Sequence, residues 1–476
     1  MRLRAGAKLE RILLLILLGM AALTIMRYVN HRQRFPRPLQ VGSLILQEMD
    51  REAARQRLQE AFSQPVTLRY LDQEGELDPK EVGFRLYAKQ MLDAVWGQPS
   101  TQLDAADFLA VTLGGATRPL PVPVAADYDL RALVRELQAM AAQWDRPARP
   151  PHLVKAKLRF APGEPARKLD IEASLPQVVG ALLSPTQRQA DLMVTQEGGE
   201  PVQRDTGLLR AAIQEFLADF PGAAGIFVKD LANDEELAMN EEVAFAGMSL
   251  MKVAIMEEFF RRKERAPTIE ETKLLTETMT LSGNYTANLL LAEIGEGNPY
   301  QGVRRLTESM RRIGLVNTFM ATPYDEDRPP PRIVTPANSR RDVDTEPDPY
   351  MQTTPQDMGL LMEMIYQGAR GGGTLIAAYP GQITPEECQA MLELMKGNRI
   401  GSLIEEGSPE GTPIAHKHGW IDDTHADAGI VFCPGGDYVL VIFLYQQGWL
   451  QWERSAPLIA DIAHVTYNYF NMDDQW

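Results

Sequence analysis

The sequence contains little cysteine and little that would attract a nucleic acid. Its two cysteines, Cys388 and Cys433, exclude a disulfide-stapled scaffold and a cysteine-rich zinc module, and leave open whether they pair with each other. Lys and Arg number 48 against 64 Asp and Glu, so the formal net charge is −16. No stripe rich in Lys and Arg occurs after the first few dozen residues. Because nucleic-acid binding needs clustered basic groups, we expect no nucleic-acid partner.

The remaining composition is ordinary for a globular chain. Hydrophobic residues make up 45% and charged residues 24% of the sequence, which is enough apolar material for a sizeable core. The chain has 476 residues, and at roughly 100–200 residues per domain this length corresponds to about three domains.

Residues 1–35 differ from the rest of the chain. An apolar run over residues 12–26 has basic residues on both sides, namely Arg2, Arg4, Lys8 and Arg11 before it and Arg27, Arg32 and Arg34 after it. A basic start followed by an apolar run is typical of a secretory signal or a signal anchor. Residues 12–29 approach the roughly 20 residues of a membrane span, and no clear cleavage site follows them. We predict a single-pass anchor in the cell membrane, with the bulk of the chain outside the cytoplasm; secretion after signal cleavage is the alternative.

Two similar stretches follow, at residues 36–120 and 121–200. Each combines helical and strand-like patterns with a Leu-Asp pair, Leu77-Asp78 in the first and Leu169-Asp170 in the second. Repetition of this order predicts two copies of one small α+β module. Neither copy contains paired carboxylates or other residues of catalytic character.

The modules resemble a peptidoglycan-binding domain of cell-surface proteins. The residues that carry the resemblance are Phe160, Pro162, Gly163, Leu169, Asp170, Val178, Ala181 and Leu182. The resemblance implies peptidoglycan as a partner of these modules. The alternative is a stalk that lifts the last domain away from the membrane.

Residues 201–476 have the pattern of an α+β domain. Strand-like segments occur near the start of this region, at 224–228 and 236–239, and again near its end, at 427–433 and 438–445. Helical segments fill the middle, and a closing helix is predicted over 457–470. Strands at both ends with helices between them predict one antiparallel sheet in which the first and last strands meet, together with a helical subdomain.

Ser249 and Lys252 stand at the start of a predicted helix. Their spacing of three residues places both side chains on the same helix face, one turn apart. A serine hydroxyl needs an adjacent base to become a nucleophile, and a lysine among apolar neighbours near a helix N-terminus tends to lose its proton. Taken alone, the pair more often marks an exposed lysine and a helix-capping serine.

Two further motifs follow Ser249 and Lys252 in a fixed order. Ser282 and Asn284 precede an apolar helix, and Lys417 and Gly419 lie in a predicted strand. The order Ser-x-x-Lys, Ser-x-Asn, Lys-x-Gly is the signature of class A β-lactamases and penicillin-binding proteins. Residues 206–470 resemble this penicillin-recognising family of serine hydrolases, most closely its class A β-lactamase-like branch.

The resemblance implies roles for the residues of the first two motifs. Ser249 would be the acylated nucleophile, and Lys252 would accept its proton. Ser282 would relay a proton to the leaving nitrogen. The backbone N–H groups of Ser249 and Trp420 would form the oxyanion hole.

The resemblance also implies the substrate-binding residues. Asn284 would hold the substrate and the lysine of the first motif, while Lys417 and His418 would bind the substrate carboxylate. Gly419 is a small residue where a substrate backbone can approach. His418 departs from the Thr or Ser that is usual there, and Gly283 stands where Asp is common, so substrate specificity is left open.

The deacylation step is the least defined part of this comparison. Class A β-lactamases activate the hydrolytic water with a Glu on the loop before a Thr-Thr-Pro sequence, here residues 353–355. No Glu-x-x-x-Asn pattern is present in that loop. Its acidic residues Asp342, Asp344 and Glu346 are the candidate bases. Without a base, the acyl-enzyme would turn over slowly.

Three hypotheses remain. The leading one is a membrane-anchored, extracytoplasmic serine hydrolase that opens β-lactams or related acyl-D-Ala peptides through an acyl-Ser249. One alternative is a penicillin-binding DD-peptidase with slow deacylation, and another is a catalytically inactive cell-wall-binding protein. We expect no cofactor, and no metal ion either, because the His-x-His pair His416 and His418 on a strand is more often incidental.

Overall fold

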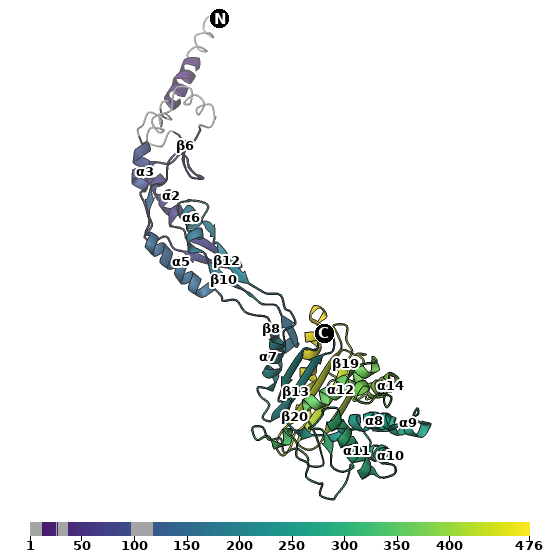
Figure 1. Cartoon of the computed structure of the whole chain (residues 1–476). Helices are drawn as coiled ribbons and strands as arrows, with labels where there is room; N and C mark the ends of the chain where they lie inside the picture. Colours follow the sequence, from purple (N-terminus) through teal and green to yellow (C-terminus); the bar gives the residue numbers. More distant parts are fainter. Residues whose placement is uncertain (1–11, 25, 27–36, 97–117) are drawn as a thin grey trace, which may run out of the picture. The chain divides into compact units, whose positions relative to one another are not determined.

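The computed structural model describes residues 12–24, 26, 37–96 and 118–476 (Figure 1). The chain divides into two units, and each is described by itself. The first comprises Met1–Arg149 and Glu164–Gly199, and the second comprises Pro150–Gly163 and Glu200–Trp476. Residues 12–24, within the predicted anchor, are helical with mostly exposed apolar side chains, while residues 25 and 27–29 of that prediction lie outside the described part. In the described ranges, no helix has the length and apolarity that crossing a membrane requires.

Within residues 37–96, 118–149 and 164–199, the first unit combines small sheets with four helices. Its sheets have the strand orders β2-β1-β6, β11-β3-β4, β10-β12 and β5-β7. The strands are β1 (Leu39–Val41), β2 (Leu44–Leu46), β3 (Val66–Tyr70), β4 (Gln73–Leu77), β5 (Arg85–Leu86), β6 (Leu120–Pro121), β7 (Ala126–Asp127), β10 (Pro165–Leu169), β11 (Gln189–Asp191) and β12 (Val194–Gly198). The helices are α2 (Arg51–Ser63), α3 (Ala88–Val95), α5 (Leu130–Trp144) and α6 (Ile171–Leu182).

The two predicted modules share a core in this unit. Strand β11 pairs in parallel with β3, although the sequence places these strands in successive modules. Leu68 of β3 therefore packs in one cluster with Leu133 of α5 and Leu182 of α6. The second Leu-Asp pair has a local cause: Leu169 is buried, and the Asp170 carboxylate accepts the Ala173 N–H at 2.9 Å and caps α6.

The second unit is built on a five-stranded antiparallel sheet of order β14-β13-β20-β19-β18. The strands are β13 (Ala223–Asp230), β14 (Glu236–Met239), β18 (Ile414–Trp420), β19 (Thr424–Val431) and β20 (Tyr438–Tyr445). The predicted meeting of the first and last strands is confirmed, because β13 pairs with β20 along its whole length. The predicted α+β class is confirmed as well.

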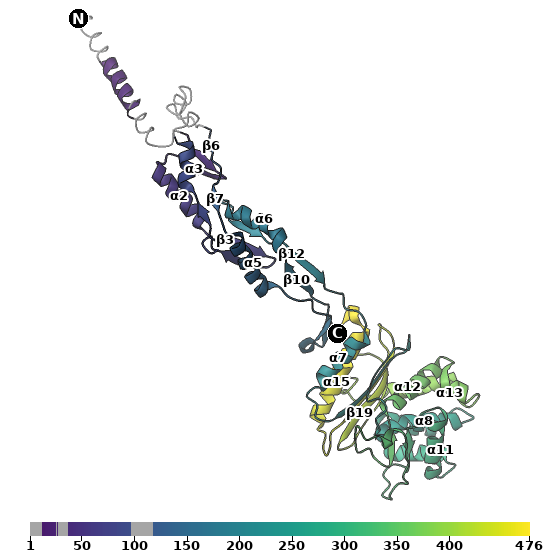
Figure 2. The same cartoon turned by 60° about the vertical axis from the view of Figure 1, so that its left-hand side comes forward.

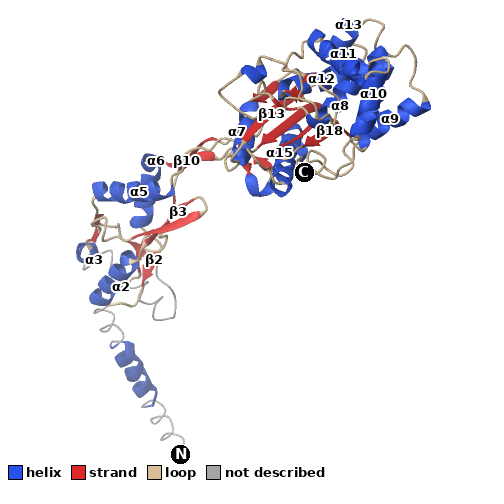
Figure 3. Ribbon diagram, turned by 90° about the horizontal axis from the view of Figure 1, so that it is seen from below, coloured by secondary structure: helices blue, strands red, loops and turns tan. Residues whose placement is uncertain are grey.

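Helices cover both faces of this sheet, as Figures 2 and 3 show. One face packs against α7 (Thr206–Leu217) and α15 (Trp452–Phe470), and the other packs against α12 (Pro355–Ala369) and the helical region. The helical region comprises α8 (Met251–Arg262), α9 (Ile269–Thr280), α10 (Asn284–Ile294), α11 (Pro299–Arg312), α13 (Gly373–Ala378) and α14 (Pro385–Lys396). A small sheet of order β15-β17-β16 adjoins it, formed by β15 (Phe245–Ala246), β16 (Phe319–Met320) and β17 (Met351–Thr353).

A hairpin from the middle of the first unit's sequence belongs to the second unit. Its strands are β8 (His152–Val154) and β9 (Arg159–Ala161), which lie within the predicted second module, residues 121–200. Phe160 is buried against Tyr469 of α15, with ring centroids 6.5 Å apart. Asn468 of α15 donates a hydrogen bond to the Leu158 carbonyl at 2.8 Å. Burial of Phe160 and this bond hold the hairpin to α15.

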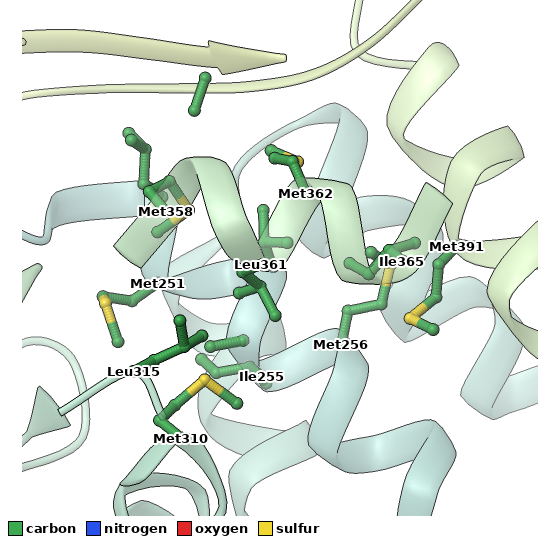
Figure 4. Packing of buried hydrophobic residues seen from close by; sticks show 14 of the residues in the cluster. Met251, Ile255, Met256, Met310, Leu315, Met358, Leu361, Met362, Ile365 and Met391 are labelled. Carbon is green, nitrogen blue, oxygen red and sulfur yellow. The ribbon is translucent and has the colours of Figure 1, made fainter. Parts of the chain in front are cut away.

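Helix α8 lies in the middle of a methionine-rich core. All residues from Met251 to Phe260 are buried. Figure 4 shows Met251 and Met256 of α8 beside Met358 and Met362 of α12 and Met391 of α14. Methionine is unbranched and fills irregular gaps between helices. The core thereby fixes the start of α8, where Ser249 and Lys252 lie.

The same helix buries an acid without a polar partner. Neither carboxylate oxygen of Glu257 has a hydrogen bond among the described residues, whereas its neighbour Glu258 accepts two from Arg261, at 2.7 and 2.6 Å. Burial, with Glu258 adding to it and Arg261 opposing it, raises the pKa of Glu257 to about 8. Glu257 is therefore mainly protonated at neutral pH.

We expect the wild type to become less stable as the pH rises, and we expect Glu257→Gln not to show this loss. The folded protein keeps a proton on Glu257 that the unfolded chain releases near its ordinary pKa of 4.5. The free energy of unfolding of the wild type should therefore fall by on the order of a few kcal/mol relative to that of Glu257→Gln between about pH 5 and pH 8. Urea denaturation midpoints across this range measure the difference. The exposed Glu308→Gln serves as the control and should follow the wild type; equal pH slopes for Glu257→Gln and the wild type would contradict the assignment.

Candidate active site

Ser249 lies in a short 3-10 turn, Met248–Leu250, immediately before α8. Met248 has a φ of +48°, in the left-handed region that non-glycine residues rarely adopt. Two bonds hold this conformation: the Tyr324 hydroxyl donates to the Met248 carbonyl at 2.8 Å, and the Gly247 N–H donates to the Met351 carbonyl at 2.9 Å. A strained backbone held by its surroundings is common at functional sites.

Lys252 is fully buried and its amine contacts three side-chain oxygens. Its Nζ lies 2.7 Å from Ser249 Oγ, 2.8 Å from Asn284 Oδ1 and 3.4 Å from Ser282 Oγ. Burial, together with the Lys417 ammonium, lowers the pKa of Lys252 to about 7, while the Asp325 carboxylate opposes the shift. At neutral pH much of Lys252 is the neutral amine, which can accept the Ser249 hydroxyl proton.

The second motif reaches Lys252 from the loop before α10. Ser282 has a φ of +59°, and Asn284 is the first residue of the helix. Asn284 uses both ends of its amide, because its Oδ1 faces Lys252 and its Nδ2 donates to Asp325 Oδ1 at 3.0 Å. The structure therefore brings together Ser249, Lys252, Ser282 and Asn284 as the sequence predicts.

Strand β18 forms the opposite side of the site. Lys417 is fully buried, its Nζ donates to the His418 carbonyl at 3.1 Å, and burial lowers its pKa to about 8 while Asp427 opposes the shift. A Cβ added at Gly419 would lie 2.9 Å from the Ser249 backbone nitrogen. Glycine at this position therefore lets β18, and the Trp420 peptide that follows, lie beside the turn of Ser249.

The three predicted deacylation bases form their hydrogen bonds and ion pairs with residues outside the cluster of Ser249, Lys252, Ser282 and Asn284. Asp342 is paired with Arg340 at 2.6 Å, Asp344 accepts the Glu346 N–H at 2.9 Å, and Glu346 accepts from Gln447 at 3.1 Å. Within the described parts of the chain, none of the three bonds to the predicted nucleophile or its lysine.

Instead, Tyr324 covers the amine, with Lys252 Nζ 4.4 Å from the centre of its ring. Asn288 holds the Tyr324 backbone from both sides, accepting its N–H at 2.9 Å and donating to its carbonyl at 3.0 Å. Sequence reasoning missed Tyr324, Asp325 and Asn288. Asn288 had a signal, since it stands one turn after Asn284 on the same face of an otherwise apolar helix.

The predicted histidines lie in the same strand and make no metal cluster. No group of three or more His, Cys, Asp or Glu placed to hold a metal ion occurs among the residues that the structure describes. Cys388 and Cys433 are both free thiols.

The fold and these motifs define a class of serine hydrolase, and comparison with known families agrees. The sequence model described as the β-lactamase enzyme family matches residues 208–267 and 265–470, more than half of the 476-residue chain. The chain therefore belongs to the β-lactamase enzyme family.

Solved structures give likenesses of fold at low identity. A structure of PBP-A is 22% identical, with 57% of this chain and 99% of that chain covered and a TM-score of 0.43. A β-lactamase from Sphaerobacter thermophilus is 18% identical, with 56% and 98% covered and a TM-score of 0.42. A β-lactamase from Xanthomonas campestris is 21% identical, with 56% and 99% covered and a TM-score of 0.42. Comparison with curated proteins finds no match.

We expect the Lys252 amine to titrate near pH 7, as measured by 13C NMR of the lysine ε-carbon and assigned with Lys252→Arg. Asp325→Asn keeps an acceptor oxygen for Asn284 but removes the charge that favours the ammonium form. The pKa of Lys252 should therefore fall in Asp325→Asn. The exposed Asp327→Asn is the matched control and should leave the titration in place. A pKa that stays unchanged or rises in Asp325→Asn would refute this electrostatic assignment.

Proposed function

We propose that this protein is a serine acyl-transfer enzyme in which Ser249 forms the covalent intermediate. The observation that carries the proposal is the buried Lys252 amine, 2.7 Å from Ser249 Oγ, with a pKa lowered to about 7. A base is most effective when its pKa lies near the working pH, and serine becomes a nucleophile only beside such a base.

The proposed acylation uses the groups around Lys252 in sequence. Ser249 Oγ attacks the carbonyl carbon of the substrate amide while its proton passes to Lys252 Nζ. The N–H groups of Ser249 and Trp420 stabilise the oxyanion that forms on the carbonyl oxygen. The proton then travels through Ser282 Oγ, 3.4 Å from Nζ, to the nitrogen that leaves as the C–N bond breaks.

The charges of the site favour an anionic substrate. The formal net charge of the chain is −16, so a carboxylate must be attracted by local cations. Lys417 is buried here and carries no ion pair within the described residues, so it can supply this positive charge. β-Lactams and acyl-D-Ala-D-Ala peptides both present a carboxylate near the amide bond that is cleaved. These are the substrate classes that we propose.

Deacylation is proposed to be slow. Among the described residues, no carboxylate forms a hydrogen bond or ion pair with Ser249 or Lys252, and the Tyr324 ring lies against the amine. The nearest acid in the network, Asp325, is bound to Asn284. A general base contributes about 10²–10⁴-fold to a rate. This arrangement favours a penicillin-binding DD-peptidase over a rapidly hydrolysing β-lactamase.

We further propose that the enzyme works outside the cytoplasm, anchored through residues 12–29, with its N-terminal unit contacting peptidoglycan. Two features support this: the apolar helical segment 12–24 with its exposed side chains, and the substrate class itself. A peptidoglycan substrate lies outside the cytoplasm, so the anchor and the site proposed here are compatible.

A labelled penicillin tests the function directly. We expect the wild type to form a covalent adduct, seen by mass spectrometry, that Ser249→Ala and Lys252→Ala both abolish, because one lacks the nucleophile and the other its base. The exposed Lys273→Ala is the control and should be labelled like the wild type. A wild type that forms no adduct would refute the enzyme proposal and leave the cell-wall-binding alternative. An adduct cleared within seconds would refute slow deacylation.

Gly419→Ala should reduce the acylation rate by about 100-fold while the protein stays folded. The new Cβ would meet the Ser249 backbone nitrogen at 2.9 Å and force the turn and β18 apart, and a displacement of about 1 Å can cost this much. Stopped-flow labelling measures the rate and circular dichroism the fold. Gly372→Ala, where an added Cβ meets nothing within 4 Å, should keep the wild-type rate. Unchanged acylation in Gly419→Ala would show that close approach at this position is not needed.

A further inference from the structure

A buried chain of polar side chains lies behind the carboxylate-binding strand, and the acyl-transfer steps above do not use it. Asp427 of β19, His416 and His418 of β18, and Asn398 after α14 are all buried. His418 faces Asp427 across the β18–β19 pairing, which brings the members of the chain together.

The proton positions in this chain follow from the acceptors. His416 Nδ1 lies 3.0 and 3.1 Å from the two oxygens of the Asp427 carboxylate, and His416 Nε2 lies 2.8 Å from the Asn398 backbone carbonyl. Both neighbours can only accept, so both ring nitrogens of His416 carry hydrogens and the ring is an imidazolium. Burial opposes this state, but Asp427 and the Asn398 carbonyl raise the pKa of His416.

The side-chain amide of Asn398 lies between His416 and His418 and contacts both rings. Its Nδ2 lies 3.1 Å from His418 Nδ1 and 3.3 Å from His416 Nε2. The His416 nitrogen already carries a hydrogen, so it cannot accept from the amide. With Nδ2 facing the two rings, the amide hydrogen is donated to His418 Nδ1, which is then the unprotonated nitrogen, and the buried Oδ1 has no partner among the described residues.

His418 is consequently a neutral ring with its hydrogen on Nε2. Burial and the ammonium of Lys417 lower the pKa of His418 to about 4, with Lys252 and His416 acting in the same direction and Asp427 against it. Its ring stacks on Trp420 at 5.2 Å with only 7° between the planes, which limits rotation. Among the hydrogen bonds of the described residues, the His418 ring takes part through Nδ1 alone.

We propose that Asn398, held by the His416–Asp427 pair, is a positioning residue that fixes His418 as the Nε2–H tautomer, so that a neutral imidazole donor and the Lys417 ammonium together recognise the substrate carboxylate. This inference rests on the proposed function for its substrate. One cation and one neutral donor of fixed direction select a planar carboxylate. An ester or amide at the same place has lost the charge that Lys417 binds and one of the two equivalent acceptor oxygens.

The tautomer is tested on the full chain without substrate. Long-range 1H–15N NMR of histidine, assigned with His418→Gln, should show the hydrogen of His418 on Nε2 in the wild type. In Asn398→Asp the side chain can only accept at His418 Nδ1, so the hydrogen should move to Nδ1. The exposed Asn298→Asp, which caps α11 through the same kind of oxygen, should leave the tautomer unchanged. A wild-type His418 with its hydrogen on Nδ1 would overturn the proposal, and this measurement does not depend on whether Asn398→Asp folds.

The binding role is read from acylation kinetics. We expect the penicillin concentration for half-maximal acylation to rise about 10-fold in Asn398→Asp, the cost of losing one hydrogen bond to a charged group, with the maximal rate nearly kept. The methyl ester of the same penicillin should show no such difference between the two proteins. An equal rise for the ester, or none for the free acid, would overturn the role. Failure of the proposed function shows separately, as a wild type that forms no adduct while the NMR result stands.

Discussion

The burial of the Lys252 amine is the constraint on which this site depends. An ammonium taken out of water is strongly destabilised unless an opposite charge compensates it, and the groups against Lys252 are two hydroxyls, an amide oxygen and the face of an aromatic ring. These partners suit a neutral amine at least as well as an ammonium. The Met-rich packing around α8 prevents the side chain from reaching solvent, so the low pKa is maintained by the core.

The same helix also buries a group that would be negatively charged in water. Glu257 is buried one and a half turns after Lys252 and is held in its neutral form by the absence of partners in the described structure. At neutral pH, Glu257 is therefore mainly protonated and Lys252 is partly deprotonated, so both buried side chains of α8 carry little charge. The negative charge of the protein is carried elsewhere, and the neighbourhood of Ser249 is left to the cation of Lys417 on β18.

The sequence predicted the parts of this molecule that depend on order along the chain. Ser249, Lys252, Ser282, Asn284, Lys417 and Gly419 are placed by helix starts and a strand, so their motifs identified both the fold and the cluster. Tyr324 and Asp325 lie in a loop with no periodicity, and which loop residue contacts Lys252 depends on the two hydrogen bonds between Asn288 and the Tyr324 backbone. The link from Asp427 to His416 depends on the register of β18 against β19, which local sequence does not reveal. The sharing of one core by β3 and β11 is likewise a long-range pairing.

The path of the chain between the two units has a consequence for how the protein can be divided into fragments. It crosses at residues 149–150, 163–164 and 199–200, because the hairpin of β8 and β9 is inserted into the sequence of one unit and packed in the other. A fragment that begins at residue 200 would lack Phe160 and leave the aromatic surface of Tyr469 bare. A single cut therefore cannot separate the second unit from the first. Residues 150–163 must be joined to residues 200–476, either by deleting the segment between them or by circular permutation.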